Sequence, residues 1–159
     1  MSTTPRFPNP AVLNPAIVES GAVMRGIAAN GSLPRPTVSM VQLRVGQLFG
    51  SDYLTALHTG LLRAAGETEE RIAAVADWKH ATQLTDAERA ALALVDAVYA
   101  PEVSDRHVSD ALYAEAAKHY DEAALMTLAG VIGQVGFFVP LALIGLPAPG
   151  LPPEQQWRE

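Results

Sequence analysis

The chain has 159 residues, 49% of them hydrophobic, which is enough for one domain with a sizeable buried core. Its net charge is −6, with 17 acidic against 11 basic residues, so the composition argues against a nucleic acid or an anionic membrane surface as partner. The absence of cysteine excludes disulfides, thiolate nucleophiles and Cys-ligated metals.

Helix signals begin near the N-terminus, and no segment shows the alternation of a β-strand. Asn14 can cap a first helix that has Pro15 at its first position, and Gly31 can end it. A second helix follows the sequence "LPRP" and is broken by Gly50. Its apolar residues recur at the three- and four-residue steps of a buried helix face: Val38, Val41, Val45 and Leu48.

Two further helices are predicted in the middle of the chain. The third begins at Ser51 or Asp52, both good N-caps, and ends at Gly66. The fourth begins at Thr68 and runs to about His80, with acidic residues at its positive end.

The next helix opens with "TDAE", in which Thr85 and Glu88 fit a capping box. The loop "APEVSD" separates it from a sixth helix that runs through Leu112 to Tyr120. Asp121 then caps a long seventh helix.

The segment from Ala123 to Leu146 has only two polar side chains, Thr127 and Gln134, and is long enough to cross a bilayer. Gly130, Gly133, Gly136 and Pro140 interrupt it, and no basic cluster flanks it. A helix that is apolar on all sides can equally be buried in a protein or an oligomer. We therefore expect a buried helix and no membrane partner.

These elements predict an all-α domain of about six to seven helices over residues 1–145. Residues 146–159 form a tail that is too rich in proline to be α-helical, and we expect it on the surface or mobile. The N-terminal segment has no apolar run like that of a secretory signal, so we expect a cytoplasmic location.

Five segments resemble, in this order, the alkylhydroperoxidase D-like (AhpD-like) branch of the carboxymuconolactone decarboxylase family: "PRFPNP", "VQLRVGQLFG", "AGETEERIAAVADW", "LTDAERAALALVDAV" and "AAKHYDEAAL". The resemblance covers roughly residues 5–145. It implies a helical bundle whose helices intertwine in a homo-trimer or homo-hexamer. The long apolar helix is then a core or subunit-interface element.

The motif of that branch is a Glu, eleven residues, and then C-x-x-C-x-x-x-H, which the resemblance links to disulfide exchange and peroxide reduction. The Glu position is Ser39 here, the two cysteine positions are Ser51 and Leu54, and only His58 matches. This chain therefore cannot run the dithiol peroxidase reaction. The decarboxylase branch of the family has a similar pattern, with a Glu and a His. Because Ser39 stands at the Glu position, the sequence also argues against lactone decarboxylation.

Four residues are candidates for catalysis. His58 titrates near neutrality and can transfer a proton, although a buried histidine bonded to backbone or water is the alternative. Tyr53 could orient a substrate carbonyl or carboxylate, or be a half-buried aromatic. Ser51 precedes His58 by seven residues, about 10.5 Å of helix rise, so it fits a cap better than a nucleophile. Ser39 could approach His58 from another helix, or be an ordinary helix serine.

Replacing a cysteine by leucine makes the predicted pocket more apolar, which favours an apolar or aromatic organic ligand. Its predicted lining is Leu54, Arg44, Phe49, Trp78 and Phe137. Arg44 could bind an organic anion or form a salt bridge, and core packing is the alternative for the aromatic residues. The four histidines lack metal-ligand spacing and no glycine-rich loop opens a helix, so we expect no metal and no cofactor.

Two functions remain open. The first is a cofactor-free acid/base enzyme of the lyase, isomerase or cyclase type, in which His58 donates or accepts a proton on a small apolar or aromatic molecule. The second is a non-catalytic oligomer that binds a small molecule or a protein, with a vestigial site.

Overall fold

The computed structural model describes residues 4–99 and 108–158. Its helices are α1 (Pro10–Leu13), α2 (Pro15–Ala28), α3 (Arg35–Leu48), α4 (Asp52–Ala64), α5 (Glu69–Ala74), α6 (Asp86–Tyr99), α7 (Asp110–Ala116), α8 (Glu122–Gly145) and the short 3-10 helix η1 (Pro153–Gln155). In the described ranges the only β pairing is an isolated bridge between Pro8 and Arg158, so the predicted all-α class is confirmed. The loop "APEVSD" lies outside the described residues.

The first predicted helix is α2, and a short helix that was not predicted, α1, precedes it. Asn9 caps α1, since its Oδ1 accepts a hydrogen bond of 2.9 Å from the backbone N–H of Ala11. Asn14 ends α1 and is the N-cap residue of α2, which has Pro15 at its first position. The Asn14 side chain makes no capping hydrogen bond. Proline lacks the N–H that would continue the preceding helix and has the backbone angle that begins a new one. The chain therefore starts again at Pro15.

The caps predicted for the later helices are confirmed. The backbone N–H of Thr85 donates to Glu88 Oε2 over 2.7 Å, and that of Glu88 donates to Thr85 Oγ1 over 3.2 Å, which is a capping box. The Asp121 carboxylate accepts from the backbone N–H of Ala124 at the start of α8. These short-range bonds set where α6 and α8 begin.

Two helices are shorter than predicted. Beyond Ala74, where α5 ends, the carbonyl of Ala76 accepts a bond from Arg44 of α3. Beyond Ala116, where α7 ends, the hydroxyl of Tyr120 donates to the carbonyl of Ala87. In both places the backbone continues as hydrogen-bonded turns, and the segment makes a tertiary hydrogen bond to another helix.

Helix α3 is central to the molecule and packs against α4, α6 and α8. Gly46 brings α3 and α4 close together, because a Cβ at this position would lie 3.0 Å from the backbone nitrogen of Thr55 and 3.1 Å from Leu54 Cβ. One cluster of buried apolar side chains joins α3, α6 and α8, and a second lies between α3, α4, α5 and α6.

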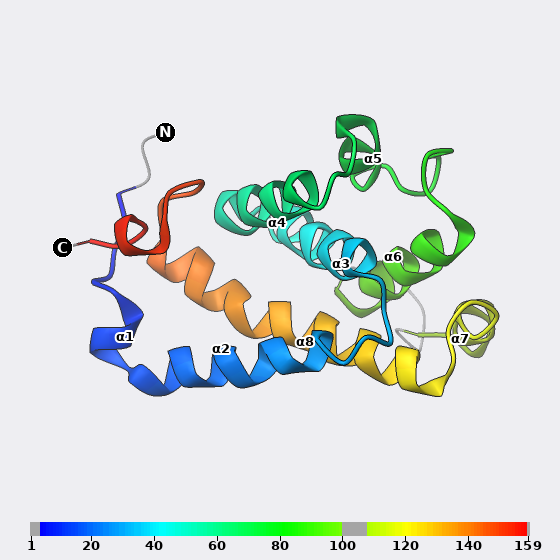
Figure 1. Ribbon diagram of the computed structural model, residues 1–159, viewed down its shortest axis with the longest axis horizontal. Helices are drawn as coiled ribbons and strands as arrows, with labels where there is room; N and C mark the ends of the chain where they lie inside the picture. The colour runs from blue at the N-terminus through cyan, green and yellow to red at the C-terminus, as the bar shows by residue number, and fades with distance from the viewer. Residues whose placement is uncertain (1–3, 100–107, 159) are drawn as a thin grey trace.

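Helix α8 is the long apolar helix, and α2 runs alongside it in a layer that faces the α3–α4 pair (Figure 1). By length and composition α8 could cross a membrane, and 44% of its most apolar stretch is buried within the fold. Its inner face belongs to the main core through Leu128, Val131, Val135 and Val139. Within the fold α8 is therefore a core helix.

The C-terminal tail contacts the rest of the molecule. The backbone N–H of Ala148 donates to the carbonyl of Gln156 over 2.8 Å, and that of Arg158 donates to the carbonyl of Phe7 over 3.0 Å. The Trp157 ring lies against Gly145 beside Phe7. The tail therefore packs against the N-terminal segment and the end of α8, as Figure 1 also shows.

Candidate functional site

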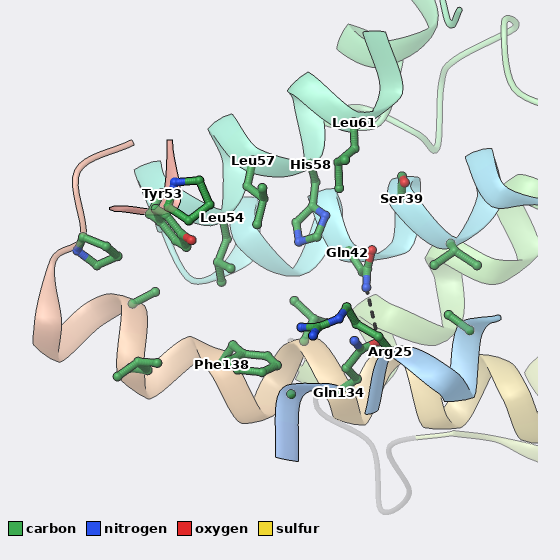
Figure 2. A pocket seen from close by; sticks show the side chains of 18 of the residues that line it. Arg25, Ser39, Gln42, Tyr53, Leu54, Leu57, His58, Leu61, Gln134 and Phe138 are labelled. Carbon is green, nitrogen blue, oxygen red and sulfur yellow. Dashed lines mark hydrogen bonds between the residues drawn. The ribbon is translucent and has the colours of Figure 1, made fainter. Parts of the chain in front are cut away.

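A cavity of about 950 Å³ lies between α2, α3, α4, α8 and the tail. Its wall on α4 includes Leu54, Leu57, His58 and Leu61. These positions are spaced i, i+3, i+4 and i+7, so they share one face of the helix. Phe138 of α8 lies on the opposite wall (Figure 2). The motif helix of the sequence analysis therefore forms one side of a largely apolar cavity.

His58 is the titratable side chain in this wall. It is only 6% exposed, and its Nδ1 has no hydrogen-bond partner in the described part of the chain. Burial lowers the pKa of His58 to about 4, because the cation loses its hydration. Figure 2 shows the ring pointing from α4 into the space between α4 and α8. At neutral pH His58 is therefore an uncharged imidazole that can accept a proton from a bound molecule.

A polar strip from α3 and α8 lies near the imidazole. Gln42 Nε2 donates a long hydrogen bond of 3.4 Å to Gln134 Oε1, drawn as a dashed line in Figure 2. Ser39, one turn before Gln42, also lines the cavity, but the described hydrogen bonds include none between Ser39 and His58. The structure thus places Ser39 and His58 at one cavity without joining them.

Tyr53 lies where α4 begins, and its hydroxyl is already in use. It donates a hydrogen bond of 2.8 Å to Gln156 Oε1 in the tail. Gln156 is buried and in turn donates from Nε2 to the carbonyl of Leu151 over 2.8 Å. Burial raises the pKa of Tyr53, so the phenol stays protonated. This hydroxyl can donate a hydrogen bond to a substrate only by giving up its bond to Gln156.

Ser51 is the N-cap of α4. Its Oγ accepts a hydrogen bond of 3.3 Å from the backbone N–H of Leu54, and the side chain is buried. It does not line the cavity. The hydroxyl therefore has the capping role that the sequence favoured over a nucleophilic one.

The structure places Arg44 and Trp78 away from the cavity, although both were predicted to line it. Arg44 binds Asp96 through two hydrogen bonds, of 2.7 Å from Nε and 2.8 Å from Nη2. Trp78 Nε1 donates to the same carboxylate over 3.1 Å. Arg44 follows Gln42 by two residues, about 200° around the helix, so it points away from the face that Gln42 presents to the cavity.

Phe49 and Phe137 also lie outside the cavity lining. Phe49 packs edge-on against Tyr99, with ring centroids 5.2 Å apart. Phe137 is partly exposed and packs edge-on against Phe138, which is the member of the pair that lines the cavity. The sequence predicted aromatic residues here without showing which face of each helix is turned inward.

Several lining residues were not predicted: Arg25, Arg35, Gln134 and Trp157. Two of them had a sequence signal. Gln134 is a polar residue in an apolar helix, and Arg25 shares a face of α2 with Gly21 and Ala28 at helical spacing. Among residues 4–99 and 108–158, no group of three or more histidine and acidic side chains is placed to hold a metal ion.

Comparison with known proteins agrees with this architecture. The Agrobacterium tumefaciens protein ATU0492, of unknown function and proposed to be the antioxidant defence protein AhpD, superposes with a TM-score of 0.83 at 19% identity, over 94% of this chain and 100% of its own. The debrominase Bmp8, solved in complex with 2,3,4-tribromopyrrole, gives 0.70 at 20% identity, over 82% of this chain and 69% of its own. The protein therefore has an AhpD-like helical fold.

The family is shown by sequence. The model of the carboxymuconolactone decarboxylase family matches residues 21–97. The uncharacterized protein YdfG of Bacillus subtilis (strain 168) is 30% identical over 112 residues, which are 70% of this chain and 75% of YdfG. The protein belongs to the carboxymuconolactone decarboxylase family, and it is a divergent member without cysteine.

Proposed function

We propose that the protein is a cofactor-free acid/base enzyme that acts on a small apolar or aromatic molecule, with His58 as the proton acceptor and then the proton donor. The observation that carries the proposal is the uncharged imidazole of His58, which has an unpartnered Nδ1 and stands in the wall of a cavity of about 950 Å³. A buried polar atom without a partner costs about 1–3 kcal/mol, and a bound substrate would supply the missing partner.

The burial that lowers the pKa of His58 also defines its chemistry. Neutral imidazole takes a proton from the substrate, and the apolar surroundings disfavour the imidazolium that forms. The proton is therefore returned to the same molecule at another atom or to its leaving group. This pattern fits isomerisation, cyclisation and elimination, none of which needs a redox partner.

The size and lining of the cavity support an aromatic or apolar substrate. Leu57 and Leu61 of α4 and Phe138 of α8 offer the apolar surface that such a molecule needs. Bmp8, which shares the fold, was solved with a small aromatic ring, 2,3,4-tribromopyrrole. This supports a ligand of similar size here, and we propose neither debromination nor peroxide reduction.

The second candidate is a non-catalytic member of the family that binds a small molecule or a protein. The observation in its favour is that Tyr53 is bonded to Gln156 and that Leu54 occupies the second cysteine position of the motif. Both candidates are compatible with a cytoplasmic homo-trimer or homo-hexamer, which we also propose.

The decisive experiment compares wild type with His58→Ala against lactones, aromatic acids and polyketide-like compounds. His80→Ala is the matched control, because His80 is exposed and lies outside the cavity. We expect turnover of at least one compound to fall by about 100-fold or more in His58→Ala and to be unchanged in His80→Ala, in line with the usual contribution of a general base. Equal turnover in all three proteins would remove His58 from the mechanism and favour the binding role.

A further inference from the structure

The charge of the cavity differs from that of the whole chain. The protein has net charge −6, yet its described cavity lining contains no Asp or Glu. Its charged members are Arg25 of α2 and Arg35 of α3. The positive charge around the cavity therefore has no acidic side chain in the lining to balance it.

These two arginines differ from four others in the described chain. Arg44, Arg63, Arg71 and Arg89 each form an ion pair with an Asp or Glu. No such pair is found for Arg25 or Arg35 within residues 4–99 and 108–158. Because guanidinium donates paired hydrogen bonds that match a carboxylate, an unpaired arginine at a cavity is suited to an anionic ligand.

Arg25 has the better geometry of the two. Figure 2 shows its side chain reaching from α2 into the cavity, on the side opposite His58. A Cβ at Gly21, one turn earlier, would lie 2.9 Å from Phe138 Cζ and 3.7 Å from Arg25 Nη1. The guanidinium therefore lies close to the Phe138 ring, where glycine leaves room for both groups. An aromatic body stacked near Phe138 would place a ring substituent within reach of Arg25.

We propose that the ligand of this cavity is a small organic acid with an apolar or aromatic body. The body lies on Leu57, Leu61 and Phe138, and Arg25 binds the carboxylate. Arg35 contributes a second positive charge without being required for the contact. This inference rests on the proposed function, since it names the chemical class of the substrate that His58 would act on.

Arg25 and His58 face the cavity from opposite sides. A ligand whose carboxylate lies on Arg25 would therefore present its apolar body to the imidazole. The unpaired Arg25 and the buried His58 are thus complementary parts of one site.

The test is a set of binding isotherms with matched ligand pairs. Benzoic, phenylacetic and cinnamic acids and their primary amides are titrated into wild type, Arg25→Gln, Arg25→Lys and His58→Gln by calorimetry at one ionic strength. Arg63→Gln is the control, because Arg63 is an exposed, ion-paired arginine of α4 outside the cavity lining. Circular dichroism confirms that each variant is folded.

We expect wild type to bind at least one acid about tenfold or more tightly than its amide, as for a charge-assisted hydrogen bond. Arg25→Gln should lose this preference while keeping the affinity for the amide. Arg25→Lys should keep part of it, and Arg63→Gln all of it. The inference is overturned if acid and amide bind equally to wild type, if Arg25→Gln weakens both alike, or if no acid binds.

The His58→Gln arm separates the two proposals. If this variant keeps the preference for acids while wild type and His58→Ala turn over every compound equally, the proposed function fails and the carboxylate site stands. If turnover depends on His58 but neutral compounds are the better ligands, the carboxylate site fails and the proposed function stands.

Discussion

The imidazole of His58 joins two properties that a purely structural histidine rarely has. It is buried, and its Nδ1 has no partner in the described chain. Buried polar atoms in folded proteins are nearly always hydrogen-bonded, because an unmade bond costs the full desolvation of the group. The stability lost at this position has a functional explanation if the missing partner is a substrate.

Replacing His58 by leucine should change how stability depends on pH. In the folded protein the pKa of His58 is about 4, against 6.5 for an ordinary histidine, so the unfolded chain binds the proton more readily between these values. The titration of His58 therefore costs the fold nothing above pH 6.5 and destabilises it increasingly as the pH falls towards 4. The loss is at most about 3 kcal/mol.

Urea denaturation of wild type and His58→Leu at several pH values between 7.5 and 4 checks this prediction. We expect the variant to be about 1–3 kcal/mol more stable than wild type at neutral pH, because the unpartnered Nδ1 is gone. The difference should widen as the pH falls. Titrations of all other groups are shared by the two proteins, so parallel curves would mean that His58 titrates alike in the folded and unfolded chains.

Arg44 illustrates what the sequence could not decide. Whether a helix arginine binds a ligand or a carboxylate of its own chain depends on a residue far along the sequence, here Asp96. The two side chains are 15% and 16% exposed, and they are joined by two hydrogen bonds. Periodicity placed Arg44 on the correct helix but carried no information about that partner.

We predict that Arg44→Leu destabilises the protein by about 2–4 kcal/mol, because it leaves a largely buried carboxylate without its counter-ion. Arg63→Gln breaks an exposed pair with Glu69 that solvent screens, so it should leave the stability almost unchanged. Both values come from urea denaturation at one protein concentration. A stable Arg44→Leu protein that no longer bound organic acids would instead restore the ligand role expected from the sequence.

At the scale of helices, the sequence predicted best where the signal is local. The caps of α4, α6 and α8 each lie within three residues of the group they bond, so residue type and spacing were sufficient. The ends of α5 and α7 were predicted too late along the chain, because the backbone continues there as turns. Pro15 marked the start of α2 correctly, whereas the short helix α1 before it was missed.

Two glycines test how closely α3 and α4 must pack. An alanine Cβ at Gly46 would meet the backbone of Thr55 and Leu54 at about the closest distance that real contacts show. At Gly60, on the exposed side of α4, it would meet nothing within 4 Å. The same substitution therefore has opposite consequences at two positions of one helix pair.

We expect Gly46→Ala to destabilise the protein by about 1–3 kcal/mol, since the helices must move apart and backbone atoms cannot yield. Gly60→Ala should stabilise it by about 0.5–1 kcal/mol through the higher helix propensity of alanine. Thermal and urea denaturation of both variants measure the two signs. A stabilised Gly46→Ala protein would show that the α3–α4 contact is looser than described.

At the scale of the molecule, the cavity is assembled from parts that are distant in sequence. One wall could be predicted because Leu54, Leu57 and His58 share a helix face. Arg25 and Phe138 come from α2 and α8, and no periodicity states which faces of separate helices meet. The tail was predicted on the surface or mobile, yet Gln156 is buried against Tyr53, because its side-chain amide accepts a bond from Tyr53 and donates one to the carbonyl of Leu151.

The packing of α1 and α2 leads to a prediction about assembly. Helix α2 contacts mainly α1 and α8, and it leaves large apolar side chains exposed. Val12 is 78% exposed, Val23 77%, and Met126 of α8 75%. Monomeric proteins rarely leave several such residues in water, so we expect further copies of the chain to cover them. Light scattering should then give three or six times the chain mass of 16.9 kDa.

A charge placed on this surface should dissociate the assembly. We expect Val23→Asp to lower the mass towards that of one chain and to make the melting temperature fall on dilution, because burying an unpaired carboxylate at an interface costs several kcal/mol. Thr82→Asp adds the same charge at an exposed polar position and should leave the mass unchanged. A wild-type protein of single-chain mass at micromolar concentration would contradict the prediction. The exposed residues of α2 would then have to be covered by a different partner, which is the outcome that the binding role requires.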